Sequence, residues 1–283
     1  MKNHSFRLLI PALAVLLAGQ CAAQNTVEAA VINKNQPVKN LEAKDFKLTL
    51  DGKDQPITQT ALGGEQRKQY YVLLFDLASL TPTDQADIRK YLPPFFDANA
   101  KPNRLFTILT YGGGLKSVQG FSNDAAMIKS AVERTVNGGG SVGTDWRNFV
   151  GAMTALSQSL AKVPGRKSIL FFTNGAIPSS APSESGGTVE LDKLAAALNS
   201  ADVVLHTIST NSSVERNFTS ATDGMYVRLE PKLADGLVKV TDEQDGMYTL
   251  TYTSSGNLKP GCHKLSLKAA GGGNVKARNL ICD

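Results

Sequence analysis

The feature that most constrains the fold of this sequence is a short apolar run at residues 70–76. Six consecutive apolar or aromatic residues are followed there by the carboxylate of Asp76. A run of this length is too short for a core helix and is typical of a strand buried on both faces. Because ligands of open α/β sheets bind at the carboxyl ends of the strands, Asp76 is a candidate binding residue.

Three further runs, at residues 104–111, 168–174 and 202–209, have the same apolar character. The stretches between these runs carry apolar residues at helical spacing, most clearly at 145–162. Strands that alternate with helices favour a parallel sheet covered on both faces. We therefore predict an α/β fold with a doubly wound, mainly parallel sheet.

The flanking regions have shorter and more polar strand candidates. These lie at 27–32, 46–50, 57–60, 246–253, 262–268 and 275–281. We expect an N-terminal β segment at 24–62, an α/β domain at 69–212 and a C-terminal β-rich segment at 213–283. The two β segments are expected to form a small subdomain of their own.

The first 23 residues are typical of a secretory signal peptide. Lys2 and Arg7 precede an apolar run at 8–18, and cleavage is expected after Ala23. The run is too short to span a bilayer comfortably. We expect an exported protein, periplasmic or secreted; a lipoprotein anchored through Cys21 is the alternative.

Charge and cysteine content narrow the possible partners. Loss of Lys2 and Arg7 lowers the formal net charge from +5 to +3, which is too weak and too scattered to favour nucleic acid or an anionic membrane. Cys262 and Cys282 remain after processing, and in an oxidising compartment such a pair predicts a disulfide, with two free thiols as the alternative. Histidine is too scarce for a histidine-rich zinc site.

One motif suggests an enzyme. Residues 139–143 match the Gly-x-Ser-x-Gly nucleophile elbow around Ser141, and His206 follows with Asp192 or Asp202 between. That motif requires a strand immediately before the serine, whereas a helical pattern precedes it here. A serine hydrolase using Ser141 therefore stays a minor alternative, and we expect no enzymatic activity.

The order of these features resembles the von Willebrand factor type A (VWA) domain. A buried strand ends in Asp76, a strand and hairpin follow, a glycine-rich loop at 138–144 opens a helix, and a further strand ends in Thr173-Asn174-Gly175. The flanks at 37–46 and 248–252 are similar to those of bacterial VWFA-related proteins. The resemblance implies a module for protein binding or cell adhesion.

Metal-dependent members of that family hold a divalent cation with an Asp-x-Ser-x-Ser motif, a loop threonine and a later aspartate. Asp76 matches the first aspartate of the motif. Ala78 and Leu80 stand where the two serines would be, and Ser79 is one place out of register. Both hydroxyl ligands of the motif are therefore missing.

The remaining positions of the motif are partly kept. Thr144 matches the loop threonine, Asn174 replaces the later aspartate, and Asp145 is a further oxygen donor. A small dication needs both ligand number and negative charge, so we predict a degenerate site formed by Asp76, Thr144, Asp145 and Asn174. Binding of Mg²⁺ or Ca²⁺, which would then accept a carboxylate from a protein partner, is the alternative. Without a metal, Asp76 would be a buried carboxylate bonded to Thr144 or to backbone N–H groups.

Overall fold

The structure is a computed structural model that describes residues 24–34, 36–63, 67–137, 146–175, 187–211, 219, 221–231, 233–254 and 258–282. Its largest element is a six-stranded sheet in the order β11-β10-β9-β6-β7-β8. The strands are β6 (Gln69–Asp76), β7 (Arg104–Tyr111), β8 (Leu115–Ser122), β9 (Lys167–Phe172), β10 (Val203–Ser209) and β11 (Tyr226–Arg228). Only β8 is antiparallel to its neighbour. The predicted doubly wound, mainly parallel sheet is confirmed.

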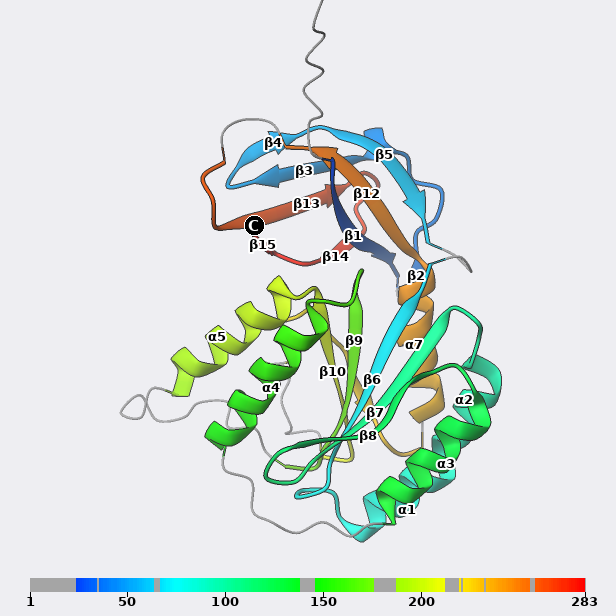
Figure 1. Cartoon of the computed structure of the whole chain (residues 1–283). Helices are drawn as coiled ribbons and strands as arrows, with labels where there is room; N and C mark the ends of the chain where they lie inside the picture. Colours follow the sequence, from blue (N-terminus) through cyan, green and yellow to red (C-terminus); the bar gives the residue numbers. More distant parts are fainter. Residues whose placement is uncertain are drawn as a thin grey trace, which may run out of the picture.

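Helices cover both faces of this sheet (Figure 1). On one side lie α1 (Pro82–Tyr91), α2 (Pro93–Asn99), α3 (Ala125–Val136) and α7 (Leu233–Asp245). On the other side lie α4 (Trp146–Leu160) and α5 (Gly187–Ser200). Each layer encloses its own apolar core. Among the described residues, no helix has the length and hydropathy needed to cross a membrane.

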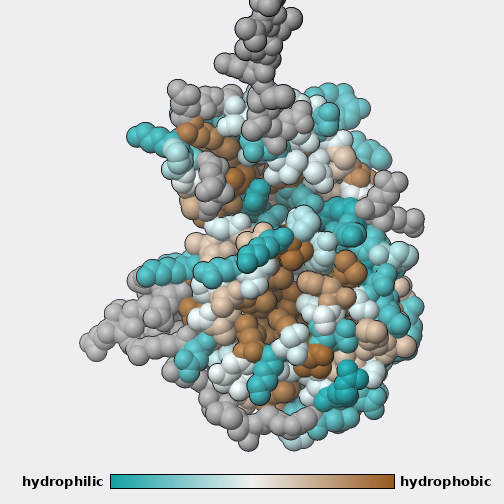
Figure 2. Space-filling view, in the orientation of Figure 1, coloured by the Kyte–Doolittle hydropathy of each residue, from teal (hydrophilic) through white to brown (hydrophobic). Residues whose placement is uncertain are grey.

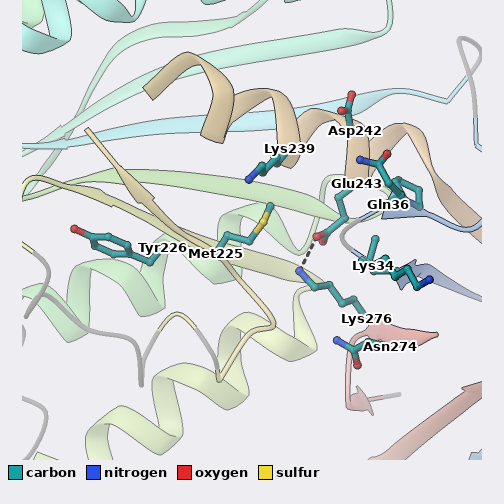
Figure 3. Close-up of a pocket in the computed structure, with 11 residues that line it drawn as sticks. Lys34, Gln36, Met225, Tyr226, Lys239, Asp242, Glu243, Asn274 and Lys276 are labelled. Atoms are coloured by element: carbon teal, nitrogen blue, oxygen red, sulfur yellow. Dashed lines mark hydrogen bonds and ion pairs between the residues drawn. The ribbon is translucent and has the colours of Figure 1, made fainter. Parts of the chain in front are cut away.

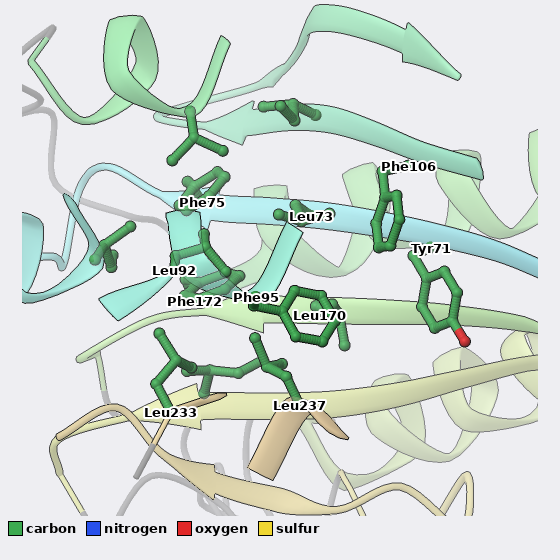
Figure 4. Close-up of a cluster of buried hydrophobic side chains, with 14 of the residues drawn as sticks. Tyr71, Leu73, Phe75, Leu92, Phe95, Phe106, Leu170, Phe172, Leu233 and Leu237 are labelled. Atoms are coloured by element: carbon green, nitrogen blue, oxygen red, sulfur yellow. The ribbon is translucent and has the colours of Figure 1, made fainter. Parts of the chain in front are cut away.

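The alternation of side chains in β6 feeds both cores. Tyr71, Leu73 and Phe75 point into the core under α1 and α3, whereas Val72 and Leu74 point toward α4. Figure 4 shows the first of these cores, in which the ring of Phe75 stacks on that of Phe172 with centroids 4.6 Å apart. The strand is therefore apolar throughout because both of its faces are covered.

Local sequence signals fix the helix that follows β6. The Thr81 side chain accepts a hydrogen bond from the Asp84 backbone N–H, while the Asp84 carboxylate accepts one from the Thr81 N–H. This reciprocal pair forms a capping box at the start of α1, with Pro82 in the first turn. Pro93 then begins α2, because a proline cannot donate the backbone bond that would continue α1.

The terminal segments form two antiparallel sheets that share a third core. The first terminal sheet contains β1 (Gln24–Asn33), β2 (Gln36–Pro37), β5 (Ile57–Leu62), β12 (Met247–Thr253) and β14 (Asn274–Ala277). The second contains β3 (Phe46–Leu50), β4 (Lys53–Gln55), β13 (Cys262–Ala269) and β15 (Leu280–Cys282); a short 3-10 helix, η1 (Ala43–Asp45), precedes β3. Both sheets lie beyond the amino-terminal ends of the parallel strands (Figure 1). The expected β-rich association of the two ends of the chain is present.

Two features of the C-terminal region differ from the sequence analysis. The single strand expected at 275–281 is two strands, β14 and β15, which pair in different sheets. In addition, β11 and α7 belong to the α/β layer, so the parallel sheet extends beyond residue 212. The apolar spacing of Leu233, Leu237 and Val240, one face of a helix, was the signal for α7.

Two ion pairs of nearly buried arginines lie near the junction of the first terminal sheet with the α/β layer. Arg67, just before β6, pairs with Glu28 of β1, and its Nε lies 2.9 Å from Glu28 Oε1. Arg104 of β7 pairs with Asp245 at the end of α7 at 2.7 Å. The first pair joins the terminal sheet to the segment before β6, and the second joins α7 to β7 within the α/β layer.

The surface is apolar in one region of the α/β layer. Figure 2 shows hydrophobic residues gathered over the strands between α3 and α4, whereas hydrophilic residues cover much of the remaining visible face. Phe121 of β8 is 39% exposed and its ring contacts that of Tyr70, with centroids 5.4 Å apart.

Candidate functional site at the carboxyl edge of the parallel sheet

The carboxyl ends of three parallel strands bring polar side chains to one edge. Asp76 ends β6, Thr173 and Asn174 follow β9, and Thr210 follows β10. Asp84 joins them from the first turn of α1. This edge faces away from the two terminal sheets (Figure 1), so none of their strands covers it.

Asp76 is held by hydroxyl groups. Its Oδ2 accepts hydrogen bonds from Ser79 Oγ at 2.6 Å and from Thr173 Oγ1 at 2.8 Å. The two hydroxyls in turn accept from the backbone N–H groups of Asn174 and Gly175. The dipoles of two N–H groups therefore act on the carboxylate through the hydroxyls, in a site where Asp76 is only 5% exposed.

The second oxygen of Asp76 is different. Oδ1 is buried and has no hydrogen-bond partner among the described residues. A buried carboxylate oxygen without a donor carries a desolvation cost, so such atoms in proteins call for an explanation in terms of a ligand, a water or a cation.

Gly175 permits this arrangement. A Cβ built on Gly175 would lie 3.0 Å from Ser79 Cβ and 3.6 Å from Asp76 Oδ2. Any side chain at 175 would therefore press on the Ser79 hydroxyl group and its bond to the carboxylate. The glycine is required for close approach of the two loops and not for an unusual backbone angle, since only a positive φ would demand the latter.

A second buried carboxylate lies beside the first. Asp84 is 2% exposed, and its Oδ2 accepts from Thr81 and from Asn174 Nδ2 at 2.9 Å. Its Oδ1 accepts from Thr210 Oγ1 at 2.8 Å. Asp84 thus ties α1 to the ends of β9 and β10, and both of its oxygens are occupied.

The edge consequently carries negative charge without a basic partner. Within the described parts of the chain, neither Asp76 nor Asp84 forms an ion pair. Neutral hydroxyl, amide and backbone donors hold both carboxylates instead. Two rigid carboxylates of this kind attract cationic groups, whether from a metal or from a partner's side chain.

The oxygen atoms at this edge do not by themselves form a complete set of ligands for a divalent cation. Mg²⁺ prefers six oxygen ligands in an octahedron, some of which can be waters. Of the described oxygens at this edge, Asp76 Oδ1 is uncommitted, while both Asp84 oxygens and Asp76 Oδ2 already accept hydrogen bonds. No group of three or more His, Cys, Asp or Glu residues with metal-binding geometry occurs in the described segments.

The sequence-based candidates are placed as follows. Asp76 and Asn174 reach the same edge, but the Asn174 amide donates to Asp84 and not to Asp76. Thr144 and Asp145 lie outside the described residues. Among the described residues, the hydroxyls of Ser79 and Thr173 bond the Asp76 carboxylate, and the backbone N–H groups of Asn174 and Gly175 reach it only through them. The alternative expected bond, to Thr144, stays a prediction.

Sequence reasoning missed three residues of the site. Thr173, Thr210 and Asp84 come from different elements, and their convergence depends on strand order. Asp84 could be recognised in the sequence as the third residue of a capped helix, but that position indicates only a structural role. Ser79 was set aside because of its register, which a turn after β6 makes irrelevant.

The hydrolase alternative depends on His206. Its Nδ1 accepts a hydrogen bond from the Met225 backbone N–H at 3.2 Å, and burial lowers the pKa of the ring to about 3, with the charges of Lys276 and Arg166 adding to the effect. Asp202 pairs with Arg166 at 3.3 Å and not with His206. Ser141 lies outside the described residues. Among the described residues, His206 therefore has no carboxylate partner of the kind that orients a catalytic histidine.

A larger cleft of about 800 Å³ lies on the α7 side, between α7, β11 and the first terminal sheet. Figure 3 shows Glu243 of α7 and Lys276 of β14 facing one another across this cleft, paired at 2.7 Å. Lys34, Lys239 and Asp242 line it at exposed positions. Glu243 and Lys276 neutralise one another, and the other charged groups of the described lining, those of Lys34, Lys239 and Asp242, are solvated.

The two C-terminal cysteines lie opposite one another in a pair of antiparallel strands. Cys262 is disulfide-bonded, and it is the Cα partner of Cys282 in the β13–β15 ladder. Directly opposed residues of antiparallel strands are within the Cα separation that a disulfide needs. The Cys262–Cys282 pairing itself stays a prediction.

Comparisons with known proteins give likeness in structure only. No family model and no curated protein matches the sequence. Similar solved structures include proximal thread matrix protein 1 from the mussel byssus (12% identity, 67% of this chain, 48% of that chain, TM-score 0.46), BatB from Bacteroides thetaiotaomicron (12%, 62%, 96%, 0.46) and the PilB minor pilin from Streptococcus sanguinis (14%, 63%, 62%, 0.43). The chain spans about half of the mussel protein and less than two thirds of the pilin.

Proposed function

We propose that this chain, whose α/β domain is VWA-like, is an exported, non-catalytic protein-interaction module with a degenerate cation site. Its partner binds at the carboxyl edge of the parallel sheet, around Asp76. The observation that carries the proposal is the pair of buried carboxylates, Asp76 and Asp84, which neutral donors hold in place without a described counter-cation.

The geometry suits recognition better than chemistry. The edge holds one buried acceptor without a described partner, Asp76 Oδ1, and a local negative potential. Its hydroxyl groups, those of Ser79, Thr173 and Thr210, donate to the two carboxylates and hold them in place. Complementary charge at an interface accelerates association and selects partners. The proposed partner therefore brings a lysine or arginine side chain to this edge, and its binding weakens as ionic strength rises.

Two glycines provide a matched test. Gly112 directly follows β7 at the candidate edge, and Gly120 lies within β8, away from it; a Cβ at either position would meet nothing within 4 Å. Gly112→Arg should block partner capture from an envelope extract, because the side chain covers the edge and adds positive charge. Gly120→Arg should leave capture unchanged. Equal capture by both variants and the parent protein would place the partner elsewhere.

A metal-dependent adhesin of the same fold is the second candidate. The unpartnered Asp76 Oδ1 favours it, because such an atom is suited to a cation. In this case Mg²⁺ or Ca²⁺, bridged to a partner carboxylate, would raise partner binding and EDTA would abolish it. Calorimetric titration of Mg²⁺ and Ca²⁺ separates the two candidates: saturable binding that is lost in Asp76→Asn supports the adhesin, and no heat supports the degenerate site.

The remaining parts of the proposal have direct tests. Labelling of Ser141 by a fluorophosphonate probe would support the serine hydrolase alternative and contradict a non-catalytic module. Mass spectrometry of the mature protein should find an amino terminus directly after Ala23, as export by a cleaved signal peptide requires. A lipid on Cys21 would instead support the lipoprotein alternative.

A further inference from the structure

A second, smaller cavity lies at the opposite end of the parallel sheet from the candidate edge. It has a volume of about 230 Å³ and is polar. Its wall is built from β1, from the loop between α4 and β9, from the turn between α5 and β10, and from Arg278 after β14. The cavity thus lies between the first terminal sheet and the α/β layer.

The two carboxylates of this wall are already occupied. Glu28 accepts hydrogen bonds from the Arg67 guanidinium and, at 2.7 Å, from the backbone N–H of Arg166. Asp202 accepts from Arg166 Nη1 at 3.3 Å. Arg67 and Arg166 therefore neutralise Glu28 and Asp202.

Lys167 is a buried cation that takes no part in these two ion pairs. It is 2% exposed, and its ammonium donates one described hydrogen bond, to the Val163 carbonyl at 2.9 Å. Burial lowers the pKa of Lys167, and the nearby charges of Arg278 and Arg166 lower it further, in opposition to Asp202 and Glu28. An ammonium group has three donors, so this one retains unused donor capacity beside the cavity.

Arg278 is a second cation of this wall, and its side chain is half-buried. Its Nη2 donates to the Thr26 carbonyl at 3.0 Å, and its buried Nε–H has no acceptor among the described residues. Within those residues, neither Arg278 nor Lys167 is paired with a carboxylate. Lys167 and Arg278 line one small cavity together with Glu28 and Asp202, whose charges Arg67 and Arg166 balance. A bound anion would offset the two positive charges that remain.

We infer that this cavity binds a small oxyanion between Lys167 and Arg278. A planar guanidinium fits the oxygens of phosphate, sulfate or carboxylate, and an ammonium adds a compact positive charge. At roughly 30 Å³ for each water molecule of liquid, the cavity has room for a tetrahedral oxyanion with several waters and not for a nucleotide. The anion bridges Arg278 of the terminal segment and Lys167 of the parallel sheet, so it strengthens the contact between the two parts.

Inorganic phosphate is the probe for a test on the mature protein. Phosphate should bind saturably in calorimetry and raise the melting temperature above that in potassium chloride of equal ionic strength, because a ligand that binds only the folded chain stabilises it. Arg278→Gln and Lys167→Met should each weaken phosphate binding at least tenfold and remove the extra melting shift. Lys162→Gln, an exposed lysine of the same loop outside the cavity wall, should match the parent protein.

The possible results of these binding measurements either support or overturn the inference. Absence of saturable phosphate binding to the parent protein overturns the inference even if a variant fails to fold. Equal binding by the parent, Arg278→Gln and Lys167→Met overturns it as well, since the anion would then bind elsewhere. If sulfate and acetate also bind, the site is a general oxyanion site; if phosphate alone binds, it is selective. None of these results depends on the partner of the candidate edge.

Discussion

Replacement of Glu28 by glutamine tests how the terminal sheets are joined to the α/β layer. The side chains of Glu28 and Arg67 are 13% and 11% exposed, so the ion pair is shielded from solvent. Glu28→Gln keeps the shape but leaves the Arg67 guanidinium as a buried charge without its partner. Removing one member of a buried pair typically costs about 3–5 kcal/mol, and because the amide can still accept a hydrogen bond from Arg166 N–H we expect about 3 kcal/mol.

Urea unfolding and thermal melting measure this loss. A destabilisation of about 3 kcal/mol corresponds to a fall in Tm of roughly 6–12 °C for a chain of this size. The double variant Glu28→Gln/Arg67→Met should be more stable than Glu28→Gln alone, since the stranded charge is then removed. Asp54→Asn breaks the exposed Lys47–Asp54 pair in the same chemical way and should change stability very little.

The pH dependence gives an independent check. Burial alone would raise the pKa of Glu28, but the hydrogen bonds and charge of Arg67, with the Arg166 N–H, hold it below its ordinary value. The carboxylate therefore stabilises the folded protein above the pKa of the unfolded chain, about 4.3, and that contribution is lost as the pH falls through the lower folded pKa. The stability difference between parent and Glu28→Gln should shrink in acid. A single variant as stable as the parent, or a double variant that loses the sum of both single losses, would refute the reasoning.

Three further predictions follow from the core, His206 and the cysteines. Phe172→Ala should cost about 3–5 kcal/mol in urea unfolding, because a fully buried stacked ring is removed, whereas Met127→Ala, at a position 48% exposed, should have little effect. The ring of His206, with a pKa of about 3, should show no protonation by NMR between about pH 8 and pH 5. Since the unfolded chain binds that proton more readily, the stability of the folded protein should decline as the pH falls below about 6.5. Half-protonation of His206 near pH 6.5 in the folded protein would contradict this prediction. Non-reducing peptide mapping should recover Cys262 and Cys282 in one linked peptide, and Cys282→Ser should lower stability by roughly 3 kcal/mol.

The long-range order of the fold was accessible from the sequence where a strand is buried on both faces. The runs that became β6, β7, β9 and β10 are buried over almost their whole length and are mainly apolar, so their boundaries were found within one or two residues. The signal was weaker where a strand has an exposed face. The last segment was therefore read as one strand instead of β14 and β15, and the short β11 had no apolar run of its own.

The candidate site was only partly predictable. Asp76 was identified because it ends the most buried strand, and a carboxylate at the end of an apolar run can be recognised from the order of residues alone. Its partners Ser79 and Thr173 are separated by 94 residues in the chain, and only the pairing of β6 with β9 brings them to 2.9 Å. No local pattern records a contact of that kind.

By itself, the sequence determined the α/β class, the strands at the centre of the sheet and the position of Asp76 at its carboxyl edge, because hydrophobic burial imposes a period and a length that can be read along the chain. The tertiary structure alone decided what surrounds that carboxylate and which charges are paired. Asp84 and Asn174 are joined there, and within the described part of the chain Lys167 and Arg278 form no ion pair with a carboxylate. Hydrogen bonds and ion pairs depend on distances of a few ångströms between remote segments, and strand order sets those distances.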